Sequence, residues 1–197
     1  MQRLVILPVL WLSFLLANPV FSADFQNGLD AYNRKDFVAA LKEWQPLAEQ
    51  GDAFAQSNLG LMYDKGQGVL QDDETAVKWY TLAAEQGNAS AQYNLGLMYR
   101  NGQGVLQDDE TAVKWYTLAA EQGDVPAQVN LGWMYDRGRG VSQNNVYAHM
   151  WWNIAASSGN EKATRNRNLT EKRMNAVDIS EALRLARECV QNNYKGC

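Results

Sequence analysis

The sequence has few of the residues that build metal centres and disulfide frameworks. Its 197 residues include two cysteines, one histidine and four prolines. Cys189 and Cys197 do not form a CxxC redox motif, and two thiols with the single histidine, His149, provide too few ligands for a metal site. We therefore expect neither a metal nor a cofactor.

Long apolar runs are absent beyond the first 25 residues. Leu4 to Ala17 is a 14-residue apolar segment preceded by a single charge, Arg3. It is short for a membrane span, and the small residues Val20 and Ser22 suit a cleavage site. The pattern predicts a secretory signal peptide over residues 1–22 and a periplasmic or secreted protein without stable membrane insertion. An uncleaved N-terminal anchor is the alternative.

An exported chain meets oxidising conditions, so the even number of cysteines predicts a disulfide between Cys189 and Cys197. It would close a short loop and restrain little chain entropy, on the order of 2 kcal/mol. We expect it to hold the C-terminal tail against the last helix.

Positive charge is scarce in the body of the chain. Residues 24–160 carry 9 Lys and Arg against 17 Asp and Glu, whereas residues 161–197 carry 8 against 5. The acidic balance argues against a general nucleic-acid or anionic-membrane binder. The basic end has two interpretations, solvated helix faces or a surface for an anionic partner.

No window alternates in the manner of a β-strand; instead, the sequence repeats itself. The segment GVLQDDETAVKWYTLAAEQG occurs twice, 36 residues apart. Three units align without gaps, at residues 52–87, 88–123 and 124–159. Such a period predicts a solenoid of stacked units.

Each unit contains two amphipathic segments, which we call helix A and helix B. In the first unit they run AFAQSNLGLMYDKG and DDETAVKWYTLAAEQG, with apolar residues at three- and four-residue steps. Asp52, Asn88 and Asp124 are placed to cap helix A. Paired glycines from Gly66 mark the turn to helix B, and Gly60 and its counterparts allow close helix contact. The fold class predicted is all-α, an α/α superhelical solenoid of stacked helix hairpins.

The flanking segments have the composition of terminal capping pieces. Residues 23–51 predict a more divergent hairpin, and residues 160–197 predict C-terminal capping helices. Within the latter, we expect one helix from about Glu161 to Glu171 and another from about Ile179 to Val190, with a capping box formed by Asp178 and Glu181.

The repeated pattern AQ-x-NLG-x-MY-x-x-G-x-GV, followed by A-x-x-WY-x-x-AAEQG, resembles the Sel-1-like repeat family over Asp52 to Gly159. That family is related to the tetratricopeptide repeats, and Gly28 to Gly51 is similar to a tetratricopeptide hairpin. The third unit departs from the pattern at His149, Trp152 and Ser157-Ser158. The resemblance implies an α/α superhelix that binds other macromolecules, in a family whose bacterial members are often exported.

Comparison of the first two units locates a candidate binding surface. Only five of their 36 positions differ, and four of these lie on helix A. At about 100° per residue they fall within a stripe about 100° wide, which faces the concave groove in tetratricopeptide-like folds. Position 61, which is Leu in both units, lies within the same stripe. We call the four differing positions and position 61, with their equivalents in the third unit, the helix-A stripe. It comprises Phe54, Ser57, Leu61, Asp64 and Lys65, then Ser90, Tyr93, Leu97, Arg100 and Asn101, then Pro126, Val129, Trp133, Asp136 and Arg137.

Apolar and aromatic side chains exposed along such a stripe favour binding of a helix or an extended peptide. Neutral drift at exposed positions is the alternative. We therefore expect a non-enzymatic scaffold for a protein or peptide partner. One alternative is a peptidoglycan or glycan module that uses Tyr93 and Trp133. Another is a β-lactam hydrolase like the cysteine-rich branch of the family, whose cysteine pair in each repeat is missing here.

Catalytic groups are poorly represented. The acidic runs beginning at Asp72 and Asp108 sit where they satisfy free N–H groups at the start of helix B. The third unit has Asn144 there, so a regular metal site is not maintained. His149 has no nucleophile at a fixed spacing, and its counterparts Val77 and Val113 indicate a helix-surface or packing role.

Overall fold

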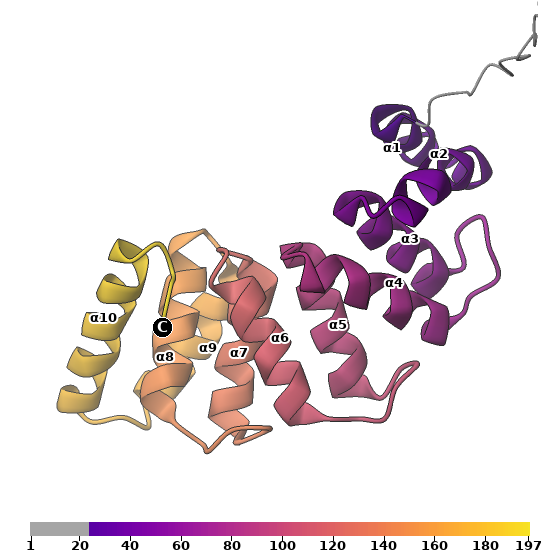
Figure 1. Cartoon of the computed structure of the whole chain (residues 1–197). Helices are drawn as coiled ribbons and strands as arrows, with labels where there is room; N and C mark the ends of the chain where they lie inside the picture. Colours follow the sequence, from indigo (N-terminus) through magenta and orange to yellow (C-terminus); the bar gives the residue numbers. More distant parts are fainter. Residues whose placement is uncertain (1–23) are drawn as a thin grey trace, which may run out of the picture.

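The computed structural model describes residues 24–197, so the expected signal peptide lies outside the described part. Over these residues the chain forms ten helices and no strand (Figure 1), which confirms the all-α prediction. The helices are α1 (Phe25–Asn33), α2 (Phe37–Glu49), α3 (Ala53–Lys65), α4 (Asp73–Glu85), α5 (Ala89–Asn101), α6 (Asp109–Ala120), α7 (Val125–Arg137), α8 (Asn145–Ser157), α9 (Glu161–Glu171) and α10 (Ala176–Gln191). Between residues 24 and 197, no helix is long and apolar enough to cross a membrane.

The helix boundaries follow from local chemistry. Asp52 accepts a hydrogen bond from the Ala55 amide at 2.7 Å and begins α3. Gly66 ends the helix in the left-handed region, with φ 64°. Asn88 and Asp124 begin α5 and α7 in the same way, so the predicted caps are confirmed.

Helix B begins at the predicted carboxylates. Asp72 accepts from both the backbone amide and the hydroxyl of Thr75, at 3.0 and 2.6 Å. The hydroxyl hydrogen bond is the main cause that lowers the pKa of Asp72. Asp108 repeats this arrangement at α6, and Asn144 caps α8. These acidic groups therefore serve the helix starts, as the sequence indicated.

Each hairpin is closed by an aromatic ring packed on a glycine. A Cβ on Gly60 would lie 2.6 Å from the ring of Tyr80, and one on Gly96 would lie 2.7 Å from Tyr116. The third repeat has Gly132 opposite Trp152 in the same way. Helix B can approach helix A this closely only because the glycine has no side chain.

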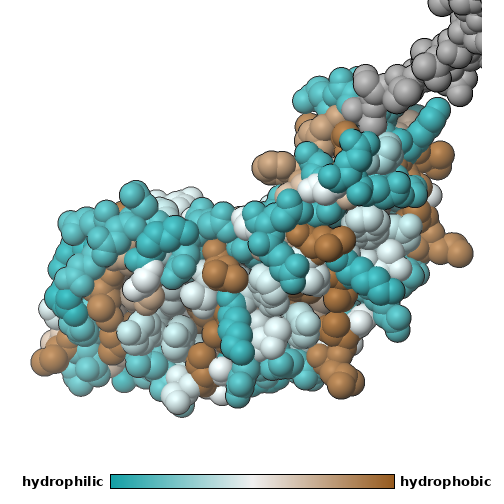
Figure 2. All heavy atoms as spheres, viewed as in Figure 1, coloured by the Kyte–Doolittle hydropathy of each residue, from teal (hydrophilic) through white to brown (hydrophobic). Residues whose placement is uncertain are grey.

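The hairpins stack in a curved row from α1 to α9 (Figure 1). From α1 to α9, each helix packs on its neighbours in sequence, and α3 also contacts α5, its counterpart in the next repeat. Figure 2 shows separate hydrophobic patches among hydrophilic side chains over the face in view.

The C-terminal end follows the predictions in part. The helix α9 has the expected bounds, but α10 begins at Ala176, earlier than predicted. Its cap is Asn175, whose side chain accepts from the Asp178 amide at 2.9 Å. The proposed capping box of Asp178 and Glu181 was wrong, because the asparagine three residues earlier takes the capping role.

The last helix returns to the body of the solenoid and packs on α8. It covers Ile154, which is 2% exposed, whereas the equivalent Leu82 and Leu118 are 45% and 44% exposed. Cys189 and Cys197 form a disulfide with an S–S distance of 2.02 Å. The tail beyond α10 reaches back to α6, where the Gly196 amide donates to Glu121 at 3.0 Å.

Candidate functional site

The helix-A stripe lies along α3, α5 and α7, and its members differ in exposure. Phe54, Lys65, Ser90, Asn101, Pro126 and Arg137 are exposed. Leu61, Asp64, Tyr93, Leu97, Arg100 and Trp133 are half-buried, and Ser57, Val129 and Asp136 are buried. The expectation that the whole stripe faces solvent was therefore wrong at three positions. Val129, for example, packs in the core against Trp152 and Ala163, at the junction of three helices.

The first repeat contributes an aromatic group and a compensated charge. Phe54 is 65% exposed and packs edge-on against Phe25 of α1, with ring centroids 6.2 Å apart. Asp64 pairs with Lys65 at 3.0 Å. This part of the stripe is therefore apolar at one end and electrically neutral at the other.

The second repeat contributes a cation on an aromatic platform. The guanidinium of Arg100 lies 5.9 Å from the ring centroid of Trp133 in the next repeat, within the range of a cation–π contact. It also donates to Asn130 at 3.3 Å. Tyr93 lies half-buried in the same helix, with its ring 6.1 Å from that of Tyr116.

The electrostatics of this region reflect its low hydration. Burial, followed by the charge of Asp124, raises the pKa of Tyr93, although Asn130 and Arg100 act in the opposite direction. Burial also raises the pKa of Tyr116. A partly dehydrated environment strengthens any ion pair formed within it.

The third repeat contributes to a cavity of about 290 Å³. Trp133, Arg137 and the buried Asp136 of α7 line it. Asp136 pairs with Arg137 at 3.2 Å and also with Arg173, which follows α9. Trp152 completes the apolar part of the wall.

Residues around α9 also line this cavity, and the sequence analysis missed them. They are Asn166, Leu169, Thr170 and Arg173. One further step of the 36-residue period relates Asn130 to Asn166 and Trp133 to Leu169. Extending the period would therefore have identified α9 as a partial fourth helix A. At the position of Gly132 it has Asn168, so it offers no glycine on which an aromatic ring of a further helix B can pack.

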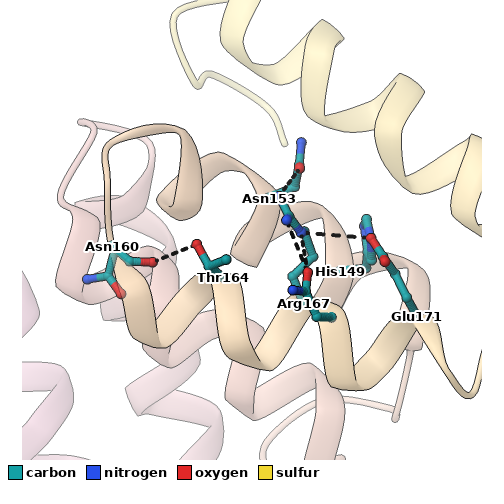
Figure 3. A network of polar contacts seen from close by, with 7 residues as sticks. His149, Asn153, Asn160, Thr164, Arg167 and Glu171 are labelled. Atoms are coloured by element: carbon teal, nitrogen blue, oxygen red, sulfur yellow. Dashed lines mark hydrogen bonds and ion pairs between the residues drawn. The ribbon is translucent and has the colours of Figure 1, made fainter.

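A polar network fixes α9 on α8 (Figure 3). His149 is fully buried, and its Nε2 lies 2.8 Å from Glu171 Oε1. Arg167 donates to Asn153 at 3.2 Å and lies 3.8 Å from the same glutamate. Of the two roles expected for His149, the structure supports packing, because the ring is enclosed between the two helices.

Between residues 24 and 197, no group of three or more His, Cys, Asp or Glu is placed to hold a metal ion. Both cysteines are in the disulfide. The surface instead presents aromatic rings, aliphatic side chains and guanidinium groups, which suit the binding of another molecule.

Comparison with protein families agrees with the repeat geometry. The model of the Sel1 repeat matches residues 53–88, 89–124 and 125–160, more than half of the chain. The chain belongs to the Sel1 repeat family. No curated protein matches the chain at the level that would mark it as a relative.

Solved Sel1 repeat structures are similar to this chain. A Sel1 repeat protein from Oxalobacter formigenes is 37% identical with a TM-score of 0.71, over 74% of this chain and 60% of that one. A protective antigen of uropathogenic Escherichia coli strains is 31% identical with a TM-score of 0.54, over 86% of this chain and 46% of that one. This chain therefore spans less than two thirds of either relative.

A third structure supports the fold alone. Cysteine-rich protein B of Helicobacter pylori is 23% identical with a TM-score of 0.52, over 66% of this chain and 94% of that one. The three matches confirm the predicted solenoid of stacked helix hairpins.

Proposed function

We propose that this Sel1 repeat protein is an exported, non-enzymatic scaffold whose helix-A stripe binds a peptide or a segment of a protein. Proteins with Sel1 repeats are commonly protein-interaction scaffolds. The observation that carries the proposal is the pattern of change between two otherwise identical repeats. Helix B is unchanged, although Lys78 and Leu82 are exposed on it, whereas helix A differs at four positions of one stripe.

The environment of the stripe supports binding by side chains held in place. Tyr93, Leu97 and Trp133 are half-buried, so each keeps part of its apolar surface accessible while neighbours restrict its motion. Residues of this kind lose little conformational entropy when a partner binds. The cavity beside Trp133 provides a pocket for one anchoring side chain.

Export is proposed on two grounds. The first is the apolar N-terminal segment with small residues at its end. The second is the disulfide, because such bonds persist in oxidising compartments. The E. coli antigen is consistent with a role outside the cytoplasm, although that name describes the relative alone.

Photo-crosslinking tests the binding surface. A photoreactive residue is introduced at Tyr93, Arg100 or Trp133 of the full chain in cells, with Lys78 and Lys114 of helix B as exposed controls. We expect a discrete protein adduct from the stripe positions and none from the controls, with mass spectrometry identifying the partner. The proposal would be contradicted if adducts formed only from the helix-B positions, if the only crosslinked partner were a glycan, or if no position gave an adduct.

A further inference from the structure

Arg100 differs from the equivalent residues of the other two repeats in two ways: its charge is positive, and within the described part of the chain it forms no ion pair. Asp64 and Asp136 occupy the equivalent positions, and both are paired with cations. Among residues 24–197, Arg100 has no carboxylate within ion-pair distance. Its hydrogen bonds go to the neutral side-chain oxygens of Asn101 and Asn130, both at 3.3 Å. The middle of the stripe therefore holds an uncompensated positive charge.

The guanidinium is held in position and is partly removed from water. Asn130 fixes one of its nitrogens, and the indole of Trp133 lies 5.9 Å from its central carbon. These contacts leave Arg100 half-buried rather than extended into solvent. A fixed guanidinium on an aromatic surface is suited to a planar carboxylate, because two parallel hydrogen bonds can form.

The adjoining cavity favours an apolar group beside that carboxylate. Trp133 lies against Arg100 and also lines the cavity, together with Trp152 and Leu169. A positively charged side chain of the peptide would not be favoured in the cavity. Among the described residues, the one carboxylate that lines it, that of Asp136, is already paired with Arg137 and Arg173. With Arg100 included, this end of the stripe is positive in a chain whose formal net charge is −4.

We propose that Arg100 pairs with the side-chain carboxylate of an internal Asp or Glu in an extended peptide, while a neighbouring apolar side chain of that peptide enters the cavity beside Trp133. This inference rests on the proposed function and names the chemistry of the partner segment. The carboxylate is assigned to an internal residue because apolar side chains that could contact the peptide lie on both sides of Arg100. Leu61 of α3 lies in one direction and Leu169 of α9 in the other.

Peptide display tests the inference without knowledge of the natural partner. The purified full chain selects from a library of random linear peptides with blocked termini. We expect Asp or Glu to be enriched at one position, with an aromatic or aliphatic residue close by. The Arg100→Asp variant, which restores the residue type of the other repeats, should lose this preference. Lys114→Asp makes the same charge change on exposed helix B and should retain it.

Binding measurements on one selected peptide complete the test. Fluorescence anisotropy should show at least about tenfold weaker binding for Arg100→Gln. Replacing the peptide's Glu by Gln should have the same effect, and combining both changes should weaken binding little further. Trp133→Ala should weaken binding of every selected peptide, because it removes the wall of the cavity.

The outcomes separate the two proposals. If the selected peptides show no preference for Asp or Glu, yet substitutions in the stripe weaken their binding, this inference is overturned and the scaffold proposal stays intact. If binding required a free C-terminal carboxylate, so that peptides were selected only from a second library with unblocked C-termini, this would also overturn it. If no peptide is selected, this inference is rejected, and crosslinking at Tyr93 and Trp133 then decides separately whether the stripe binds a folded protein.

Discussion

Two buried tyrosines illustrate how much a single position constrains the hairpin. Tyr80 and Tyr116 pack on glycines of helix A, and both hydroxyl groups are buried without a hydrogen-bond partner. At the same position Trp44 and Trp152 donate their indole N–H groups to backbone carbonyls, at 3.2 and 3.1 Å. The ring is therefore required for packing at this position, whereas the phenol hydroxyl leaves a polar atom unsatisfied.

We predict that Tyr116→Phe leaves stability near neutral pH unchanged or raises it by about 0.5–1 kcal/mol, since an unsatisfied buried group is removed. Burial raises the pKa of Tyr116 above its ordinary value of 10.0. The folded state therefore holds the Tyr116 proton more tightly than the unfolded state does. The resulting contribution to the free energy of unfolding is present below about pH 10 and is lost as the pH rises further. Urea unfolding across this range should show a shallower alkaline loss for the variant.

The half-buried Tyr99→Phe serves as the control for the loss of a hydroxyl in the same repeat. A decrease of more than about 1 kcal/mol for Tyr116→Phe would show that its hydroxyl makes a favourable interaction after all.

At the scale of the helix, one glutamine in each repeat joins helix A to the helices on both sides. Gln92 donates to the Ala84 carbonyl of the preceding helix at 3.1 Å and accepts from Gln122 at 2.8 Å. The third repeat keeps the first bond through Gln128, but Ser158 replaces the second glutamine. The Oε1 of Gln128 is consequently buried without a partner.

We predict that Ser158→Gln raises the free energy of unfolding by about 0.5–1.5 kcal/mol, because its amide can donate to Gln128 as in the other repeats. The reverse change, Gln122→Ser, should lower stability by about 1–3 kcal/mol by leaving Gln92 unsatisfied. Chemical denaturation measures both. Ser142→Gln, at an exposed turn, controls for the added side chain. Equal effects at positions 142 and 158 would refute this account.

At the scale of the whole molecule, the contacts between successive repeats are interchangeable. A Cβ on Gly104 would meet the carbonyl of Asp73, and one on Gly140 would meet that of Asp109. Both aspartates belong to identical helices B. Helix α7 therefore requires a surface that α4 presents as well as α6 does, and solenoid stability is approximately a sum of such nearest-neighbour terms.

We predict that deletion of residues 88–123 yields a chain that still folds, because α7 then packs on α4 through the same residues. The tail contact to Glu121 would be taken over by its counterpart Glu85. Circular dichroism should show unchanged helix content per residue, and the denaturant m value should fall with the loss of buried surface. A molten or unfolded product would contradict the equivalence of the two interfaces. The shortened chain also lacks Arg100, so we expect it to lose any preference for acidic peptides.

The sequence by itself determined the repeating unit and its punctuation. The caps at Asp52 and Asn88, the left-handed glycines after helix A and the carboxylates before helix B all depend on residues a few positions apart. The glycine opposite the aromatic ring was also predictable, because both residues recur at the same spacing in the nearly identical first and second units. The bounds of α9 followed from the same local rules.

Only the tertiary structure decided which stripe residues are accessible and where the solenoid ends. Val129 and Asp136 share a helix face with Trp133, yet α9 buries the first, and Arg173, which follows α9, pairs with the second. The return of α10 onto α8 likewise depends on Ile154 meeting Ala186, far along the chain. A helical period places residues on a face, but burial and charge compensation arise from segments that only the folded chain brings together.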